Sequence, residues 1–141
     1  MQKKAAEKGF ADRITFVGAV SNESLIELYQ QSDVVVFPSV VAAGGDREGF
    51  GLVLVEALGC ERATVVSDLP AMADIVTDGV TGLVVPQKNT ARLADGVIRL
   101  LGDPQLRTSL GRAGRQYVVD RFDWQIVAGR YRRLIHSIAG D

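Results

Sequence analysis

The sequence contains one cysteine, Cys60, among its 141 residues. A single thiol allows neither an intrachain disulfide nor a cysteine metal cluster, and it favours a reducing compartment. The chain also lacks an excess of charge of either sign, since 16 basic and 17 acidic residues leave a net charge of −1. Proteins that bind nucleic acid through its phosphates carry clustered lysines and arginines, so we expect no nucleic-acid partner.

Long hydrophobic runs are absent as well. A membrane-spanning helix needs about 20 consecutive apolar residues, and no segment of the sequence approaches that length. The polar residues 1–8 also lack the apolar stretch of a secretion signal. We therefore expect a cytoplasmic protein without a membrane span. A length of 141 residues allows one domain with a hydrophobic core, residues 1–141.

Short β-branched runs alternate with helical patterns along the chain, which is typical of βαβ units and a parallel sheet. Strands are predicted at residues 13–17, 33–37, 64–67 and 82–85. After the last strand we expect three helices that fold back over the sheet. The final one, within residues 120–141, carries apolar side chains at helical spacing and is expected to pack on the domain.

The segment from Glu48 to Glu56 is where chemistry is most strongly indicated. The two carboxylates flank a Gly-X-Gly turn that leads into residues 52–58, an apolar run too short to distinguish helix from strand. Glycines let a backbone approach a ligand closely, and a helix N-terminus binds phosphate. Carboxylates accept hydrogen bonds from hydroxyls. These residues suit a ligand with phosphate and hydroxyl groups, or a surface turn with two solvated acids.

Five short motifs occur in order along the chain: Phe37-Pro38-Ser39, Glu48-Gly49-Phe50-Gly51, Glu56-Ala57, Val65-Val66-Ser67-Asp68 and Gly79-Val80-Thr81-Gly82-Leu83-Val84-Val85-Pro86. In this order and spacing they resemble the C-terminal domain of the group 1 (family 4) retaining glycosyltransferases, which have the GT-B architecture. The resemblance runs from about residue 3 to residue 135. It implies an α/β fold, a Rossmann-like parallel sheet with flanking helices, here as a partial GT-B C-terminal domain. It also implies a helix over residues 52–59.

The resemblance further implies a role for each residue of the motif. Glu48 would be the catalytic residue, which contacts the hydroxyls of the donor sugar and positions it. Glu56 would bind the ribose hydroxyls, Ser39 would line the mouth of the site, and the nucleobase would lie near the turn that includes Val20. The backbone that would hold the diphosphate belongs to Gly49, Phe50, Gly51 and Leu52. No metal ligand and no cofactor is implied besides the nucleoside-diphosphate sugar itself.

The implied reaction is transfer of a sugar, of the hexosyltransferase type, from a nucleoside diphosphate to an acceptor hydroxyl with retention of configuration. Polysaccharide biosynthesis is the process that the family's range suggests. Such enzymes also have an N-terminal acceptor domain, and their C-terminal domain begins with two strands whose loops supply an Arg and a Lys to the phosphates. The chain lacks both parts, so we expect it to be truncated relative to the family.

We therefore expect donor binding, with transfer to a glycan, lipid or small-molecule acceptor only when an acceptor domain is added. Two alternatives are a non-catalytic nucleotide-sugar-binding or assembly module and a fragment without independent activity. The missing strands would leave residues 13–17 and 33–37 without neighbours, and an open sheet edge invites pairing with another chain. We expect either that these two strands pair with each other or that the chain forms a homodimer.

Two segments depart from the family pattern. Glu61-Arg62-Ala63 stands where the family usually has a Gly-Thr-Pro-like turn. Residues 69–76 stand where it usually has a Gly-Gly pair and a Pro-Glu-Ile-Val block. These changes are expected to alter the loop that faces the donor sugar, so the sequence does not identify that sugar.

Overall fold

A computed structural model describes residues 2–41 and 51–139 of the chain. The described part contains a parallel sheet of three strands in the order β1 (Val34–Phe37), β2 (Ala63–Ser67) and β3 (Leu83–Val85). In its register, Val36 lies opposite Val65. All five residues of β2 are buried, as expected of a central strand that is covered on both faces. The α/β, Rossmann-like fold class is thereby confirmed, as are the predicted strands at 33–37, 64–67 and 82–85.

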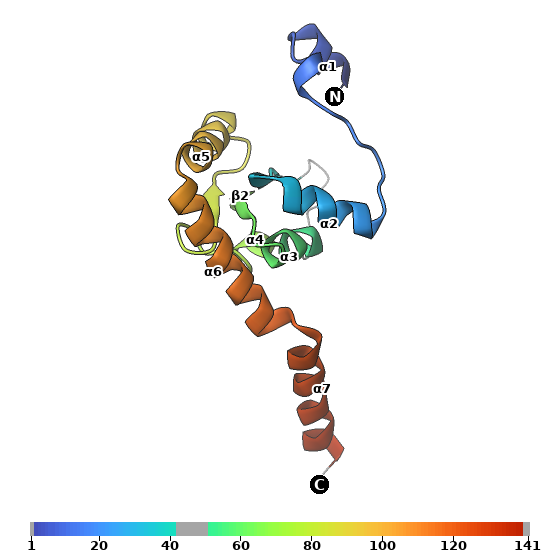
Figure 1. The fold of residues 1–141 in the computed structure, drawn as a ribbon. Helices are drawn as coiled ribbons and strands as arrows, with labels where there is room; N and C mark the ends of the chain where they lie inside the picture. The colour runs from blue at the N-terminus through green and yellow to red at the C-terminus, as the bar shows by residue number, and fades with distance from the viewer. Residues whose placement is uncertain (1, 42–50, 140–141) are drawn as a thin grey trace.

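Helices cover both faces of this sheet (Figure 1). Those that contact the sheet or one another are α2 (Asn22–Gln31), α3 (Leu52–Gly59), α4 (Pro70–Ala73), α5 (Thr90–Gly102) and α6 (Pro104–Phe122). One apolar cluster joins Val66 to α3, α4 and the second half of α6, while the other joins Val65 to α5 and the first half of α6. Successive residues of β2 therefore feed opposite cores, as the two-residue period of a strand requires. The helix that the family resemblance implied over residues 52–59 is confirmed as α3.

Glycines let α6 lie directly against its neighbours. A Cβ at Gly111 would overlap the backbone carbonyl oxygen of Glu61, and one at Gly114 would come within 2.5 Å of a methyl carbon of Leu58. Because backbone atoms cannot rotate away from an added methyl group, the close approach at Gly111 depends on the missing side chain. This contact places α6 against the turn between α3 and β2.

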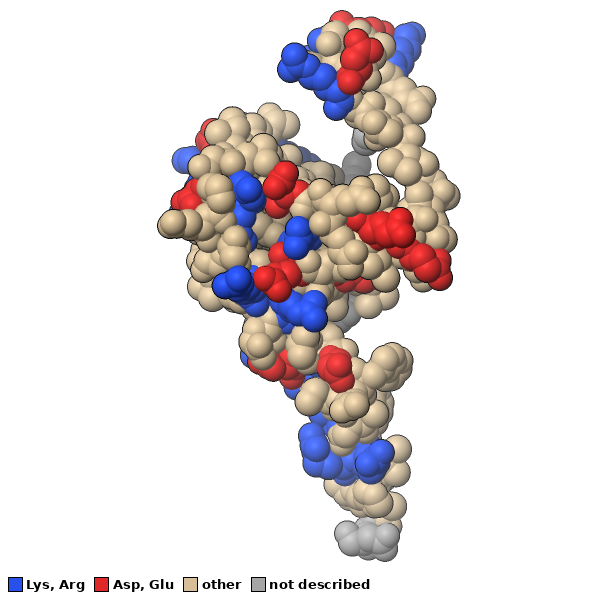
Figure 2. Space-filling model, viewed as in Figure 1, with Lys and Arg blue, Asp and Glu red and all other residues tan. Residues whose placement is uncertain are grey.

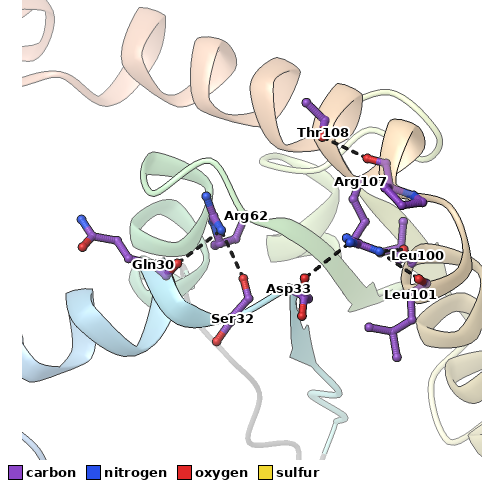
Figure 3. A network of polar contacts seen from close by, with 9 residues as sticks. Gln30, Ser32, Asp33, Arg62, Leu100, Leu101, Arg107 and Thr108 are labelled. Atoms are coloured by element: carbon purple, nitrogen blue, oxygen red, sulfur yellow. Dashed lines mark hydrogen bonds and ion pairs between the residues drawn. The ribbon is translucent and has the colours of Figure 1, made fainter.

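Two arginines tie helix ends to the amino edge of the sheet (Figure 3). Arg62 donates hydrogen bonds to the backbone oxygens of Gln30 at 3.4 Å and Ser32 at 3.2 Å, at the end of α2. Arg107 donates to the carbonyl oxygens of Leu100 at 2.8 Å and Leu101 at 2.9 Å. It also pairs with Asp33 at 3.4 Å, one residue before β1. Charged donors thus satisfy carbonyls that a helix C-terminus leaves without an intrahelical partner.

The outer edge of β3 is occupied by a side chain from the preceding turn. The backbone N–H of Val84 donates to Oδ1 of Asp78 at 2.8 Å. Val84 pairs with Val66 of β2 on its other side. A carboxylate therefore takes the hydrogen bond that a further strand would otherwise accept.

The segment before α2 differs from the prediction. Gln2–Glu7 forms helix α1, and Gly9, with φ +73°, lies two residues beyond its end. Residues 14–17 do not form a strand, because no described strand lies beside them to pair with their backbone. They follow a 3₁₀ helix, η1 (Ala11–Arg13), and their side chains are exposed. Of the two alternatives expected for residues 13–17 and 33–37, pairing with each other is wrong, since β1 pairs only with β2 among the described strands, and a homodimer stays a prediction.

The last helix, α7 (Trp124–Ala139), extends away from the sheet (Figure 1) and packs mainly against α6. None of its described residues is buried, and Trp124 and Ile138 are 82% and 77% exposed. The helix therefore does not fold back over the sheet as expected, although it does contact α6. Both faces of the sheet are already covered by the other helices, so no apolar face of it is left for α7. No helix of the described chain has the length and hydrophobicity needed to cross a membrane.

Replacing Gly111 by alanine should destabilise the fold. The added methyl group must displace either α6 or the turn at Glu61, and such overpacking costs about 1–3 kcal/mol. Gly102→Ala is the matched control, because a Cβ there meets no atom within 4 Å. Urea unfolding measures both changes. A Gly111→Ala chain as stable as the Gly102→Ala chain would show that α6 does not need this close approach.

Candidate functional site

The carboxyl ends of the three strands meet at one edge of the sheet. Ser39 follows β1 by two residues and is half-buried, Asp68 follows β2 directly, and Gln87 follows β3 by two residues. The N-terminus of α3 follows the chain that leaves β1. Open parallel sheets bind ligands at this edge, so the residues around it form the candidate site.

Gly51 is the N-cap of α3 and adopts a left-handed conformation, with φ +71° and ψ +45°. Its carbonyl oxygen accepts hydrogen bonds from Leu54 at 2.8 Å and Val55 at 3.4 Å. Glycine adopts this conformation without steric cost. An added Cβ would also come within 3.0 Å of the Met72 side chain. Glycine at position 51 therefore allows the chain to enter α3 in a left-handed conformation, with no side chain to clash with Met72.

The solvent-facing side of α3 carries Leu52 and Glu56. These residues are four apart, so they lie one turn from each other on the same face of the helix. Both are exposed, whereas Leu54, Ala57 and Leu58 are fully buried beneath them. A helix N-terminus carries a partial positive charge, which favours an anion there. The face thus presents this positive end at Leu52 and a carboxylate one turn further on.

The remaining predicted site residues are placed less completely. Glu48, Gly49 and Phe50 lie outside the described residues, so their predicted roles stay predictions. Val20 is exposed, two residues before α2, next to Ser21, whose hydroxyl caps that helix. The structure therefore brings Leu52 and Glu56 together next to Gly51, and places Ser39 at the end of a neighbouring strand.

Gln87 is a residue of this edge that the sequence analysis did not single out. Its side-chain oxygen accepts a hydrogen bond from the backbone N–H of Val41 at 3.1 Å. Its own backbone N–H donates to Oδ1 of Asp68 at 2.8 Å. Gln87 thereby connects the segments that follow all three strands. In the sequence, a polar residue after Pro86 is typical of a turn. The one signal that Gln87 lies at this edge of the sheet was its position just beyond the last predicted strand.

Tyr29 is a second such residue, and it brings α2 against the back of the site. It is the buried residue of α2, 6% exposed, and α2 contacts α3. Burial raises the pKa of the Tyr29 hydroxyl above its usual value, and the negative charge of Glu56 raises it further.

The two departures from the family pattern lie at different places. Glu61 and Arg62 precede β2, which begins at Ala63, and they lie at the edge of the sheet opposite the candidate site, where Arg62 caps α2. Residues 69–76 follow β2 on the site's side, but Leu69, Met72, Ile75 and Val76 are core residues. The first departure therefore does not face the site, and the second contributes mainly packing.

Comparisons with known proteins agree with this geometry. The family model described as "Glycosyl transferases group 1" matches residues 1–117 of the chain. The chain belongs to this family. Its sheet and flanking helices are those of the C-terminal domain of a group 1 GT-B glycosyltransferase.

Three similar proteins show how much of such an enzyme the chain spans. A phosphatidyl-myo-inositol mannosyltransferase of Mycobacterium leprae is 34% identical over 138 residues, which are 98% of this chain and 35% of the relative. Sucrose-phosphate synthase of Thermosynechococcus elongatus has a TM-score of 0.85 at 31% identity, covering 97% of this chain and 33% of its own. HepE of Anabaena, in complex with UDP-glucose, has a TM-score of 0.83 at 21% identity, covering 96% and 35%, and shows the same fold.

The chain thus spans about a third of the length of the curated relatives it matches. The matched third includes the carboxyl-edge site described above.

Replacing Gln87 by alanine should loosen the site edge. Val41 loses its acceptor, and a hydrogen bond of this kind contributes about 0.5–1.5 kcal/mol. Hydrogen exchange followed by NMR should show the Val41 amide exchanging several-fold faster, with β2 amides unchanged. Gln105→Ala, an exposed residue of α6, is the control. Equal Val41 exchange in both variants would contradict the role given to Gln87.

Proposed function

We propose that the chain is the donor-binding half of a glycosyltransferase, which binds a nucleoside-diphosphate sugar at the carboxyl edge of its sheet. The observation that carries this proposal is the exposed face of α3, with Leu52 and Glu56 one turn apart beyond the left-handed Gly51. Membership of the glycosyltransferase family and the UDP-glucose bound by HepE support it.

Each part of this face suits one part of the donor. The diphosphate lies at the start of α3, where N–H groups and the helix dipole favour negative charge and no side chain intrudes at Gly51. Four residues of helix rise about 6 Å, comparable with a ribose and its 5′ carbon, and this brings Glu56 to the ribose hydroxyls. A carboxylate accepts hydrogen bonds from both hydroxyls of a vicinal diol.

The sugar end of the donor falls to Glu48, with Gly49 and Phe50 beside the phosphates and Ser39 at the mouth of the site. In this proposal Glu48 orients the donor sugar and stabilises developing charge by electrostatics rather than acting as a nucleophile. The nucleobase lies towards Val20. Transfer to the acceptor hydroxyl proceeds with retention, assisted by the departing phosphate.

Transfer requires an acceptor-binding part, which we propose covers the exposed apolar face of α7. Trp124, Tyr131, Ile135 and Ile138 lie on one side of this helix and are exposed. Figure 2 shows the basic side chains of α7 beside uncharged ones. Sucrose-phosphate synthase reproduces 97% of this chain within a protein about three times as long. That neighbour therefore has about two thirds of its chain beyond the part that this chain matches.

Glu56→Ala should weaken nucleotide-sugar binding at least tenfold, because the ribose hydroxyls lose a charged acceptor worth about 1.5–3 kcal/mol. Calorimetric titration with UDP-, GDP- and ADP-sugars measures the affinity. Glu27→Ala, an exposed glutamate of α2, should leave it unchanged. Saturable binding that survives Glu56→Ala would refute the assignment of Glu56, and no binding of any donor at millimolar concentration would refute the proposed function.

The role of α7 is tested in a chimera in which this chain replaces the matching third of the M. leprae mannosyltransferase. Tyr131→Ala combined with Ile135→Ala should lower sugar transfer at least tenfold, since buried interface anchors each contribute more than about 1 kcal/mol. Arg132→Ala with His136→Ala, on another side of the helix, is the control. Equal turnover of the two double variants, or an α7-dependent homodimer of this chain alone, would contradict the proposal.

A further inference from the structure

Asp68 lies at the carboxyl edge of the sheet, directly after the central strand β2. Its backbone N–H donates to the carbonyl oxygen of Val85 at 2.9 Å, so the ladder between β2 and β3 continues to this residue. The side chains of a strand alternate between the two faces of a sheet, so Asp68 falls on the same face as Val66. That face is the one that α3 and α4 cover. Asp68 therefore stands on the side of the edge where α3 begins.

A short series of contacts joins the turn that carries Asp68 to the start of α3. An added Cβ at Gly51 would come within 3.0 Å of the terminal methyl carbon of Met72, in α4. The backbone N–H of Met72 donates to the carbonyl oxygen of Leu69 at 2.9 Å, and Leu69 directly follows Asp68. This turn is therefore packed, through α4, against the N-terminus of α3.

The Asp68 side chain is both fixed and accessible. Its Oδ1 atom accepts the backbone N–H of Gln87 at 2.8 Å, and the side-chain amide of Gln87 donates to the Asp68 carbonyl oxygen at 3.5 Å. Asp68 is nevertheless exposed. An ionised carboxylate has about four acceptor sites, and the bond from the Gln87 N–H needs only one of them. The carboxylate can therefore accept hydrogen bonds from a ligand without giving up the bond that orients it.

The charge of this carboxylate determines which part of a nucleoside-diphosphate sugar it suits. It repels a diphosphate at the start of α3, whereas it attracts the hydroxyl hydrogens of a sugar. In the donor-site proposal the ribose lies at Glu56, one turn along α3 from Leu52. The sugar, at the other end of the diphosphate, therefore extends past the start of the helix and over the strand ends. Asp68 directly follows the central one of these strands.

We propose that Asp68 is a sugar-binding residue of the donor site: its carboxylate accepts a hydrogen bond from a hydroxyl of the donor sugar, and Gln87 holds it in position. This inference rests on the proposed function, since it concerns the same site. It adds a residue from the end of β2 to a site otherwise built from α3 and the chain that follows β1. It also predicts that Asp68 contributes affinity only when the ligand carries its sugar.

The test compares each nucleotide sugar with its free diphosphate by calorimetric titration of the full chain, using UDP-glucose, GDP-mannose and ADP-glucose. For the pair that binds most tightly, Asp68→Ala should weaken binding of the nucleotide sugar about tenfold, because a hydrogen bond to a charged group is lost. Affinity for the free diphosphate should stay unchanged or rise up to about twofold, since a nearby negative charge is removed.

Two further variants separate sugar binding from folding. Asp68→Asn keeps an acceptor for the Gln87 N–H and should show the same dependence on the sugar, with a loss of about threefold or more. Asp78→Asn is the matched control. Oδ1 of Asp78 also accepts a backbone N–H, from Val84 at 2.8 Å, and Asp78 is exposed, but it precedes β3 and lies at the opposite edge of the sheet. It should leave both affinities unchanged.

Two results would overturn the inference. Equal loss of affinity for the nucleotide sugar and its free diphosphate would show that Asp68 acts through the fold of the edge. Unchanged affinity for both would show that Asp68 does not contact the donor. Either result leaves the donor-site proposal standing, because Glu56→Ala weakens binding of both ligands. Failure of the unsubstituted chain to bind any of these diphosphates or nucleotide sugars would remove the proposed function and this inference together.

A second measurement identifies the hydroxyl that Asp68 binds. Analogues of the nucleotide sugar that lack the 2-, 3-, 4- or 6-hydroxyl of the hexose remove one hydrogen-bond donor at a time. For one of them, the difference in affinity between the unsubstituted chain and Asp68→Ala should largely disappear, because the bond is then absent from both complexes. An equal effect of Asp68→Ala on all four analogues would show that it meets no particular hydroxyl, and would overturn the inference.

Discussion

Val65 and Val66 point to opposite faces of β2, and each is fully buried against a different set of helices. Burial of an apolar side chain of this size stabilises a fold by about 1.5–3 kcal/mol relative to exposure. The helices that cover these two faces are α3 with α4 on one side and α5 on the other, with α6 reaching both. The position of α3, and with it the candidate site, therefore follows from the need to cover β2.

This dependence separates two tasks along α3. Its inner face, with Leu54 and Leu58, packs on the sheet, while its outer face presents Leu52 and Glu56. Substitutions on the outer face therefore leave the buried residues of the core in place. Arg62 and Arg107 lie at the other edge of the sheet, so Arg62 contributes to the attachment of α2 without facing the site.

The sequence predicted most of what local pattern can determine. The run at 34–37 was recognisable because a doubly covered strand is apolar throughout, whereas residues 52–59 needed the family resemblance to be identified as a helix. The strand at 13–17 was wrong because β-branched residues describe a preference, and a strand exists only beside a partner. The helical spacing of apolar residues showed that α7 has an apolar face, but this spacing does not identify which part of the protein covers that face.

The candidate site follows the same division. Glu56, Gly51 and Leu52 were predicted from a contiguous motif, since neighbours in sequence stay neighbours in a short helix. Gln87 was not, because its hydrogen-bond partner, Val41, lies 46 residues away along the chain. Contacts over such separations depend on the sheet order, which the sequence of one chain does not display.

The hydrogen bond between the Val84 N–H and the Asp78 carboxylate makes the two edges of the sheet unequal. With a carboxylate on the outer N–H of β3, a further strand on that side would have to displace it and leave a charge without its partner. On the opposite side, β1 carries no such side chain in the described chain, so the energetic barrier to strand addition is lower there. The side chain of Asp78 therefore occupies a position that an added strand at β3 would need, which protects that edge of the sheet against edge-to-edge aggregation.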